Sequence, residues 1–138
     1  MLRFAILVAA ATALPFTLAA AQTTPNPIDC AKAASTVEMN TCAERDFAAA
    51  DRILNEAYSR ALAEIAVSDN PAPYAPAAWE KELRASQRAW IAFCDADCKG
   101  VVPMEWRGGT GTSSAVLGCM IDLTKARAKD LTECYGKR

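Results

Sequence analysis

Six cysteines constrain this chain of 138 residues more than any other feature. An even number of cysteines in a small exported protein is typical of a disulfide framework, because the destination is oxidising and a small core benefits from cross-links. Zinc binding is the alternative, but the chain has no histidine and no Cys-x-x-Cys pair, so the usual ligand spacings are missing. We therefore expect disulfides and no bound metal ion. The six are Cys30, Cys42, Cys94, Cys98, Cys119 and Cys134.

The first 21 residues have the pattern of a cleaved export signal. Arg3 precedes an apolar run over residues 4–18, and the run ends in three alanines at 19–21. A basic start, an apolar middle and an Ala-x-Ala exit form a secretory signal peptide. A membrane anchor is the alternative, but the run is shorter than the roughly 20 residues of a spanning helix, and Pro15 interrupts it. We expect a signal peptide over residues 1–21, a periplasmic or secreted protein, and no stable membrane insertion after cleavage.

The remaining chain divides into a short leader and one domain. Residues 22–29 are polar and contain two prolines, which predicts a flexible leader. Residues 30–135 suffice for one modest core and not for two, so we expect a single domain there. Without the signal, 14 basic and 16 acidic residues remain, a net charge of −2. This balance lacks the basic footprint of a protein that binds nucleic acid.

A long first helix is predicted from Ser35 to about Val67. Residues 35–38 read Ser-Thr-Val-Glu, the S/T-x-x-E form of a capping box, in which serine and glutamate satisfy the free N–H groups of the first turn. No glycine or proline follows before Val67, and apolar residues recur at steps of three and four. This periodicity predicts one buried face. Its members are Phe47, Ala50, Leu54, Ala57, Ala61 and Ile65.

Two further helices are predicted after a break at residues 71–76, where three prolines prevent a helix from continuing. One spans about 77–96 and the other about 114–134. Between them, residues 99–114 are rich in glycine and threonine and predict a long loop. Since no alternating strand pattern occurs, the predicted fold class is all-α, an antiparallel bundle of about three helices cross-linked by disulfides. The inward stripe predicted for the second helix is Trp79, Leu83, Ser86, Trp90 and Phe93.

The spacing of the cysteines limits their pairing. Cys94 and Cys98 are four residues apart on a helix, where their Cβ atoms would be about 6 Å apart. A disulfide needs about 4 Å, so each should pair with another segment. Six cysteines allow fifteen connectivities, and spacing alone does not choose among them.

Several segments, taken in order, resemble the lysozyme inhibitor LprI-like family. The first is the opening string CAKAASTVEMNTC, and the later ones include ADRILNEAY and QRAWIAF. The resemblance covers about residues 30–131 and implies a small secreted or periplasmic helical domain, with lysozyme inhibition attributed to some members. The matching segments are residues 30–42, 50–58, 87–93, 95–98, 108–110, Cys119 and 123–127.

Two cysteines depart from the family pattern. Cys94 occupies a position where the family usually has arginine, and Cys134 lies outside the shared set. An added bridge between them is one expectation from the resemblance. The antiparallel packing of the second and third helices opposes it, because the two residues would then lie near opposite ends of the bundle. The long loop over 99–114 could reverse that packing, so we expect Cys94–Cys134.

No catalytic residue is predicted, so we expect no enzyme activity. Without histidine, neither a Ser-His nor a Cys-His nucleophile system can form. Asp95 and Asp97 are two residues apart on a helix end and point in different directions, so an ion pair with Arg88 or Lys99 is expected in place of acid–base work. The Gly-Gly-Thr run lacks the lysine and the preceding strand of a phosphate-binding loop, so no cofactor is expected.

Polar side chains on the first helix form one stripe in the part that resembles the family. Asp51, Asn55 and Tyr58 recur at helical spacing. Direct contact with a ligand is one interpretation. Hydrogen bonds to another helix or to the 99–114 loop are the expected role.

The predicted loop is the best candidate for a contact surface. Loops of this length are uncommon in compact domains and are often functional. Tryptophan and arginine are enriched at binding hot spots, and glycine allows close backbone approach. The alternative is that the tryptophan tucks under the bundle and the glycines only form a turn. The candidate partner-binding residues are Lys99, Trp106, Arg107, Gly108, Gly109 and Thr110.

Two functions follow as hypotheses. The first, from the resemblance, is an exported envelope protein that binds and inhibits lysozyme. The second is a structural or adaptor module of the cell envelope that binds another envelope protein and makes no lysozyme contact.

Overall fold

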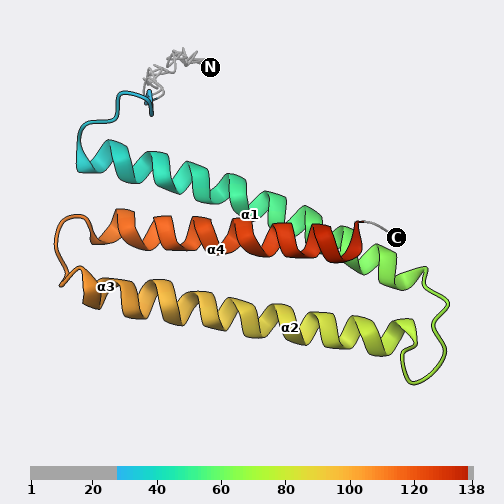
Figure 1. Cartoon of the computed structure of the whole chain (residues 1–138). Coiled ribbons are helices and arrows are strands. Elements are labelled where there is room, and N and C mark those ends of the chain that lie inside the picture. The colour runs from blue at the N-terminus through green and yellow to red at the C-terminus, as the bar shows by residue number, and fades with distance from the viewer. Residues whose placement is uncertain (1–27, 137–138) are drawn as a thin grey trace, which may run out of the picture.

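The computed structural model describes residues 28–136, and within them it forms an antiparallel bundle of three long helices. These are α1 (Thr36–Ala66), α2 (Pro76–Ala96) and α4 (Thr112–Tyr135). In Figure 1, α2 runs opposite to α1 and α4, and α1 packs against both of the other helices. The predicted all-α bundle is confirmed. The predicted signal peptide and most of the predicted leader lie outside the described residues.

The capping box predicted at the start of α1 is present. The backbone N–H of Glu38 donates to the Ser35 hydroxyl at 3.2 Å, and the Ser35 N–H donates to the Glu38 carboxylate at 3.0 Å. The hydrogen bonds from the backbone N–H groups of Ser35 and Ala34 lower the pKa of Glu38 below its usual value. The first turn of the longest helix is therefore satisfied by its own side chains.

The core lies along the face of α1 that the sequence predicted. Ala50, Leu54, Ala57, Ala61 and Ile65 are all buried, whereas Phe47 is only half-buried. Alanines let α4 approach α1 closely, and Ala128 supplies a small residue from the α4 side. The cluster is completed by larger apolar residues from α2 and α4, namely Leu83 and Leu131.

Helix α2 packs on the bundle through larger side chains. The Trp79 ring lies 5.8 Å from the Tyr135 ring, measured between centroids. Arg127 of α4 donates to the Gln87 side-chain oxygen at 3.1 Å and to the Ser86 hydroxyl at 3.1 Å. The stripe predicted for this helix is wrong at Phe93, which is 53% exposed, and at Ser86, which is also exposed.

The long loop predicted over residues 99–114 is mostly helical. Helix α2 continues through the π-helical segment η1 (Asp97–Val101) into the single turn α3 (Val102–Glu105). Pro103 did not end the helix because it falls in the first turn of α3, where its missing N–H costs nothing. The connection to α4 is therefore only the segment 106–111.

Two disulfides are formed among the described residues, and they differ from one predicted pairing. Cys30 is bonded to Cys42, and Cys98 to Cys119. The predicted Cys94–Cys134 bridge is wrong, because both thiols are free. Cys94 lies near the C-terminal end of α2 and Cys134 near the C-terminal end of α4. Since these helices are antiparallel, the two residues lie at opposite ends of the bundle (Figure 1).

Candidate functional site

The segment 106–111, called here the α3–α4 turn, projects from one end of the bundle. Trp106 ends α3, and the next two residues have left-handed backbone, with φ of 51° at Arg107 and 66° at Gly108. The Gly108 N–H donates to the Pro103 carbonyl at 3.3 Å, which closes the helix end. Glycine adopts this conformation freely, but arginine does so at a cost. The backbone at Arg107 is therefore held in a conformation that its own residue type disfavours.

Trp106 packs on the α3–α4 turn and still presents much of its ring to solvent. A Cβ atom built on Gly111 would lie within 2.4 Å of the Trp106 ring, so the indole covers this glycine. The Gly109 N–H donates to the Trp106 carbonyl at 3.0 Å. The Trp106 residue remains 51% exposed, so it does not tuck under the bundle, and its contact with a partner stays a prediction. It is a fixed apolar surface at the tip.

Covalent and polar links fasten this end of the bundle. The Cys98–Cys119 bridge joins η1 to α4, and the Cys30–Cys42 bridge fastens the chain before α1 onto its second turn. The Ser114 hydroxyl donates to the Asn40 side-chain oxygen at 2.6 Å, which links the first turn of α4 to α1. The segments on either side of the α3–α4 turn are therefore linked to the rest of the bundle by a disulfide and a hydrogen bond.

Lys99 does not belong to the same segment as the other predicted residues. It lies in η1, and its ammonium is 2.6 Å from the Asp95 carboxylate. The predicted ion-pair role of Asp95 is confirmed by this contact. Trp106, Arg107, Gly108, Gly109 and Thr110 are brought together in the turn, and all five are exposed.

Exposed apolar residues beside the turn were missed by the sequence reasoning. Val101 is 50% exposed and Met104 is 77% exposed, and they lie on the η1 and α3 segments that were predicted as loop. Had the helix been extended through Pro103, their lack of a core partner would have identified them as a surface feature. Exposed methionine and tryptophan residues close together in sequence, as at Met104 and Trp106, are typical of contact surfaces.

Only part of the polar stripe predicted on α1 reaches another helix, because Tyr58 interacts through its side chain with Arg84 of α2. The Asn55 amide donates to the Asp51 carboxylate at 2.9 Å, and both residues are exposed. Tyr58 is half-buried and packs against the core. The prediction that this stripe bonds another element is therefore wrong for Asp51 and Asn55, which bond each other.

One acidic residue lies close to a pair of sulfurs. The Asp97 carboxylate and the sulfurs of Cys98 and Cys119 lie within 4.8 Å of one another. Both sulfurs are joined in the disulfide, so neither is a thiolate that could ligate a metal ion.

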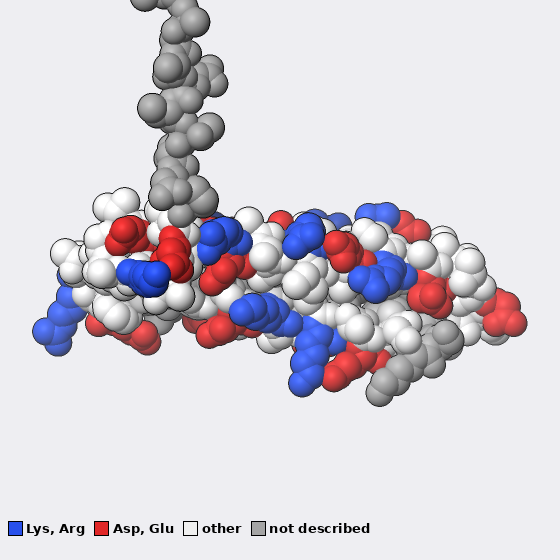
Figure 2. Space-filling view, turned by 90° about the horizontal axis from the view of Figure 1, so that it is seen from above, with Lys and Arg blue, Asp and Glu red and all other residues white. Residues whose placement is uncertain are grey.

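Charges of both signs are interspersed on the surface. Figure 2 views the molecule from the side of α1 and shows basic and acidic side chains mixed along the whole face. Some charged residues form ion pairs within one helix, such as Arg60 with Glu56 at 3.5 Å in α1 and Arg84 with Glu80 at 2.7 Å in α2. Among the described residues, no helix is long and apolar enough to span a membrane.

The fold and this end of the bundle define a class of protein: a small all-α domain, braced by disulfides, that presents a rigid turn and no catalytic constellation among its described residues. The disulfides are consistent with an oxidising compartment. A family model described as "Lysozyme inhibitor LprI" matches residues 29–131, and the chain belongs to this family.

A relative supports the assignment across most of the chain. The uncharacterized protein R02472 of Rhizobium meliloti (strain 1021) is 38% identical over 112 residues, which covers 79% of each chain. No solved structure matches the chain.

Proposed function

We propose that this protein is exported and that it binds and inhibits lysozyme through the α3–α4 turn. The observation that carries the proposal is the left-handed arginine at the tip of a disulfide-braced turn. Strained backbone of this kind is concentrated at functional sites, because the surrounding structure must hold it in place. Membership of the family supports lysozyme as the partner.

The chemistry of the turn suits the cleft of a glycoside hydrolase. Such a cleft holds two carboxyl groups flanking the scissile bond. The guanidinium of Arg107 offers a planar set of donors that matches a carboxylate at two points. The neighbouring glycines carry no side chain, so the backbone of the turn can approach the cleft closely, while the N–H groups of Gly108 and Gly109 stay bonded within the turn. Arg107 is therefore the residue that enters the cleft, and the glycines allow it to reach the carboxylates.

Apolar contacts flank this arginine. Trp106 and Met104 are both more than half exposed, at 51% and 77%, and they lie on the same short segment. Burial of an aromatic anchor next to a charged pair excludes water from the pair and strengthens it. These two residues form the apolar border of the contact, with Arg107 at its centre.

The links on either side of the α3–α4 turn explain how a small turn can bind a partner tightly. Ordering a loop on binding consumes part of the interaction free energy, and a turn that is already ordered avoids that loss. The Cys98–Cys119 bridge and the hydrogen bond from Ser114 to Asn40 fix the segments on either side of the turn. Reduction of the bridges should therefore weaken inhibition even where the helices remain folded.

A cell-wall lysis assay tests the proposal. Oxidised protein should slow lysis by lysozyme in a dose-dependent way, and Arg107→Ala should raise the concentration needed by about tenfold or more. Arg88→Ala is the matched control, since Arg88 is an exposed arginine on α2 away from the turn. Unchanged lysis at a large molar excess of the oxidised protein would reject inhibition, and an abundant non-lysozyme partner purified from the envelope would favour an adaptor role.

A further inference from the structure

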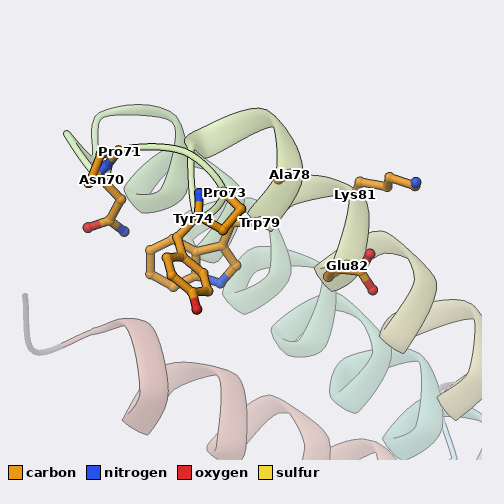
Figure 3. A pocket seen from close by; sticks show the side chains of 8 residues that line it. All are labelled: Asn70, Pro71, Pro73, Tyr74, Ala78, Trp79, Lys81 and Glu82. Atoms are coloured by element: carbon orange, nitrogen blue, oxygen red, sulfur yellow. The ribbon is translucent and has the colours of Figure 1, made fainter.

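A second concave surface lies at the opposite end of the bundle from the α3–α4 turn. It is a hollow of about 810 Å³ between the α1–α2 connection and the first two turns of α2. Its size falls in the range of small-molecule sites, which are mostly apolar with a few polar groups. Figure 3 shows the residues that line it. They are Asn70, Pro71, Pro73, Tyr74, Ala78, Trp79, Lys81 and Glu82.

Two aromatic rings lie at the centre of this hollow. Trp79 is half-buried and packs on Tyr135 of α4, with ring centroids 5.8 Å apart. Tyr74 is 72% exposed, and its backbone N–H donates to the Pro71 carbonyl at 2.9 Å. Pro71 and Pro73 restrict the backbone on either side of that turn. The Trp79 ring and the backbone that carries Tyr74 are therefore fixed, and the Tyr74 ring is open to solvent.

Polar side chains at the edge of the hollow have no partner within the described part of the chain. Asn70, Lys81 and Glu82 make no hydrogen bond or ion pair there, whereas the neighbouring Glu80 is paired with Arg84. In Figure 3, Asn70 and Glu82 lie on either side of the aromatic pair. The amide offers donors and an acceptor, the carboxylate offers acceptors, and the ammonium of Lys81 offers donors.

We propose that this hollow binds a neutral oligosaccharide of pyranose rings. One basic and one acidic residue line the hollow, and in Figure 3 the Lys81 ammonium points away from the aromatic pair, so no cluster of like charges selects an ionic ligand. A pyranose presents a face of C–H groups that stacks on an aromatic ring and hydroxyls that both donate and accept. Tyr74 and Trp79 supply the first kind of contact, and Asn70 and Glu82 the second.

The surface has room for more than one ring. A second hollow of about 280 Å³ shares Trp79 and Glu82 with the first. Its other lining residues come from α2 and α4 and include Leu83, Leu131 and Tyr135. A linear chain of rings could therefore continue from the first hollow past Trp79 into the second. This site is separate from the α3–α4 turn, so it does not depend on the proposed inhibition of lysozyme.

The test is a binding measurement on the oxidised protein with defined sugars. Tetrasaccharides of glucose and of N-acetylglucosamine are titrated while the indole N–H resonances of the protein are followed by NMR. We expect at least one sugar to shift the Trp79 resonance and leave that of Trp106 unchanged. Tyr74→Ala and Glu82→Gln should each weaken binding by about tenfold. Trp106→Ala is the matched control and should bind the sugar as the unmodified protein does.

Each contrary outcome can be recognised. Absence of any shift with both sugars up to their solubility limits would overturn the proposal, as would equal binding by Glu82→Gln, which is a surface change that leaves the core intact. A Trp79 shift with choline or with a proline-rich peptide, but with neither sugar, would assign the hollow to another ligand. Circular dichroism of each variant establishes that it is folded, and the lysis assay on Tyr74→Ala should be unchanged.

Discussion

Two substitutions of Arg107 distinguish the effect of its backbone conformation on stability from the effect of its guanidinium on inhibition. Arg107 has φ of 51°, a left-handed conformation in which an L side chain is disfavoured and glycine is not. Arg107→Gly removes both the guanidinium and the backbone cost. Arg107→Ala removes the guanidinium but keeps a Cβ atom, so it retains the cost. We therefore expect the two variants to be equally poor inhibitors but to differ in stability.

The size of the difference follows from two opposing terms. The left-handed conformation costs an L-residue about 1–2 kcal/mol. Glycine loses about 0.5–1 kcal/mol more conformational freedom on folding than alanine does. The net advantage of Arg107→Gly over Arg107→Ala is therefore roughly 0.5–1 kcal/mol, equivalent to a rise in Tm of about 2–6 °C for a domain of this size.

Thermal unfolding followed by circular dichroism measures this advantage, and the lysis assay measures inhibition on the same samples. If Arg107→Gly unfolds at the same temperature as Arg107→Ala, the backbone at this position is not strained and the argument from strain to function fails. If Arg107→Ala inhibits as well as the unmodified protein, the guanidinium does not contact the partner.

Three further predictions concern the cysteines and the start of α1. Replacing both Cys98 and Cys119 with alanine opens a loop that the disulfide closes over 21 residues. In a urea titration, the free energy of unfolding should fall by about 3 kcal/mol, and a fall of less than about 1 kcal/mol would contradict the bracing role. Glu38 has a lowered pKa in the folded state, so its contribution is present above its usual value of about 4.5 and is lost as the pH falls through the lower folded value. The stability of the protein relative to Glu38→Gln should accordingly decline as the pH is lowered below about 4.5, and a constant difference would refute this. Iodoacetamide should modify the exposed Cys134 in the folded protein, while the buried Cys94, whose thiol pKa is raised chiefly by burial, should react only on unfolding; equal rates at the two sites would be inconsistent with the structure.

The helices could be predicted because their determinants are local. The capping box at Ser35 and Glu38, the apolar period along α1 and the prolines before α2 each act within a few residues of where they occur. Only Phe47 departs from the predicted α1 face, because it is half-buried where the other members are buried. Local rules therefore sufficed for the class of fold and for the bounds of the long helices.

The predictions for Pro103, for the cysteine pairing and for Phe93 were wrong because these features depend on how the helices pack. Pro103 reads as a helix breaker in sequence, but its position in the first turn of α3 makes it compatible with a helix. Cys98 points toward α4, where it is bonded to Cys119. Cys94 lies one helical turn earlier on the same face and is buried, whereas Phe93 lies on another face and is exposed. The partner of a cysteine is a neighbour in space, and nothing in the spacing of the six identifies it.

The candidate site could be predicted only in part. Tryptophan, arginine and two glycines in succession identified the turn that projects from the bundle. The left-handed conformation of Arg107 and the contact of Trp106 with Gly111 depend on how α3 ends and α4 begins, which the sequence does not state. Val101 and Met104 were missed because their segment was predicted as a loop.

Both covalent links and the bond from Ser114 to Asn40 lie toward one end of the molecule. The rest of the bundle depends on packing and on the hydrogen bonds of Arg127 with Gln87 and Ser86. At the other end, the last turn of α4 is held by contacts such as that of Tyr135 with Trp79. We expect hydrogen exchange and proteolysis to begin at residues 67–75 and at the end of α4. The three helices should then separate from each other starting at this end of the bundle. Heating short of full unfolding would then erase the oligosaccharide site first and leave the turn that carries Arg107 assembled.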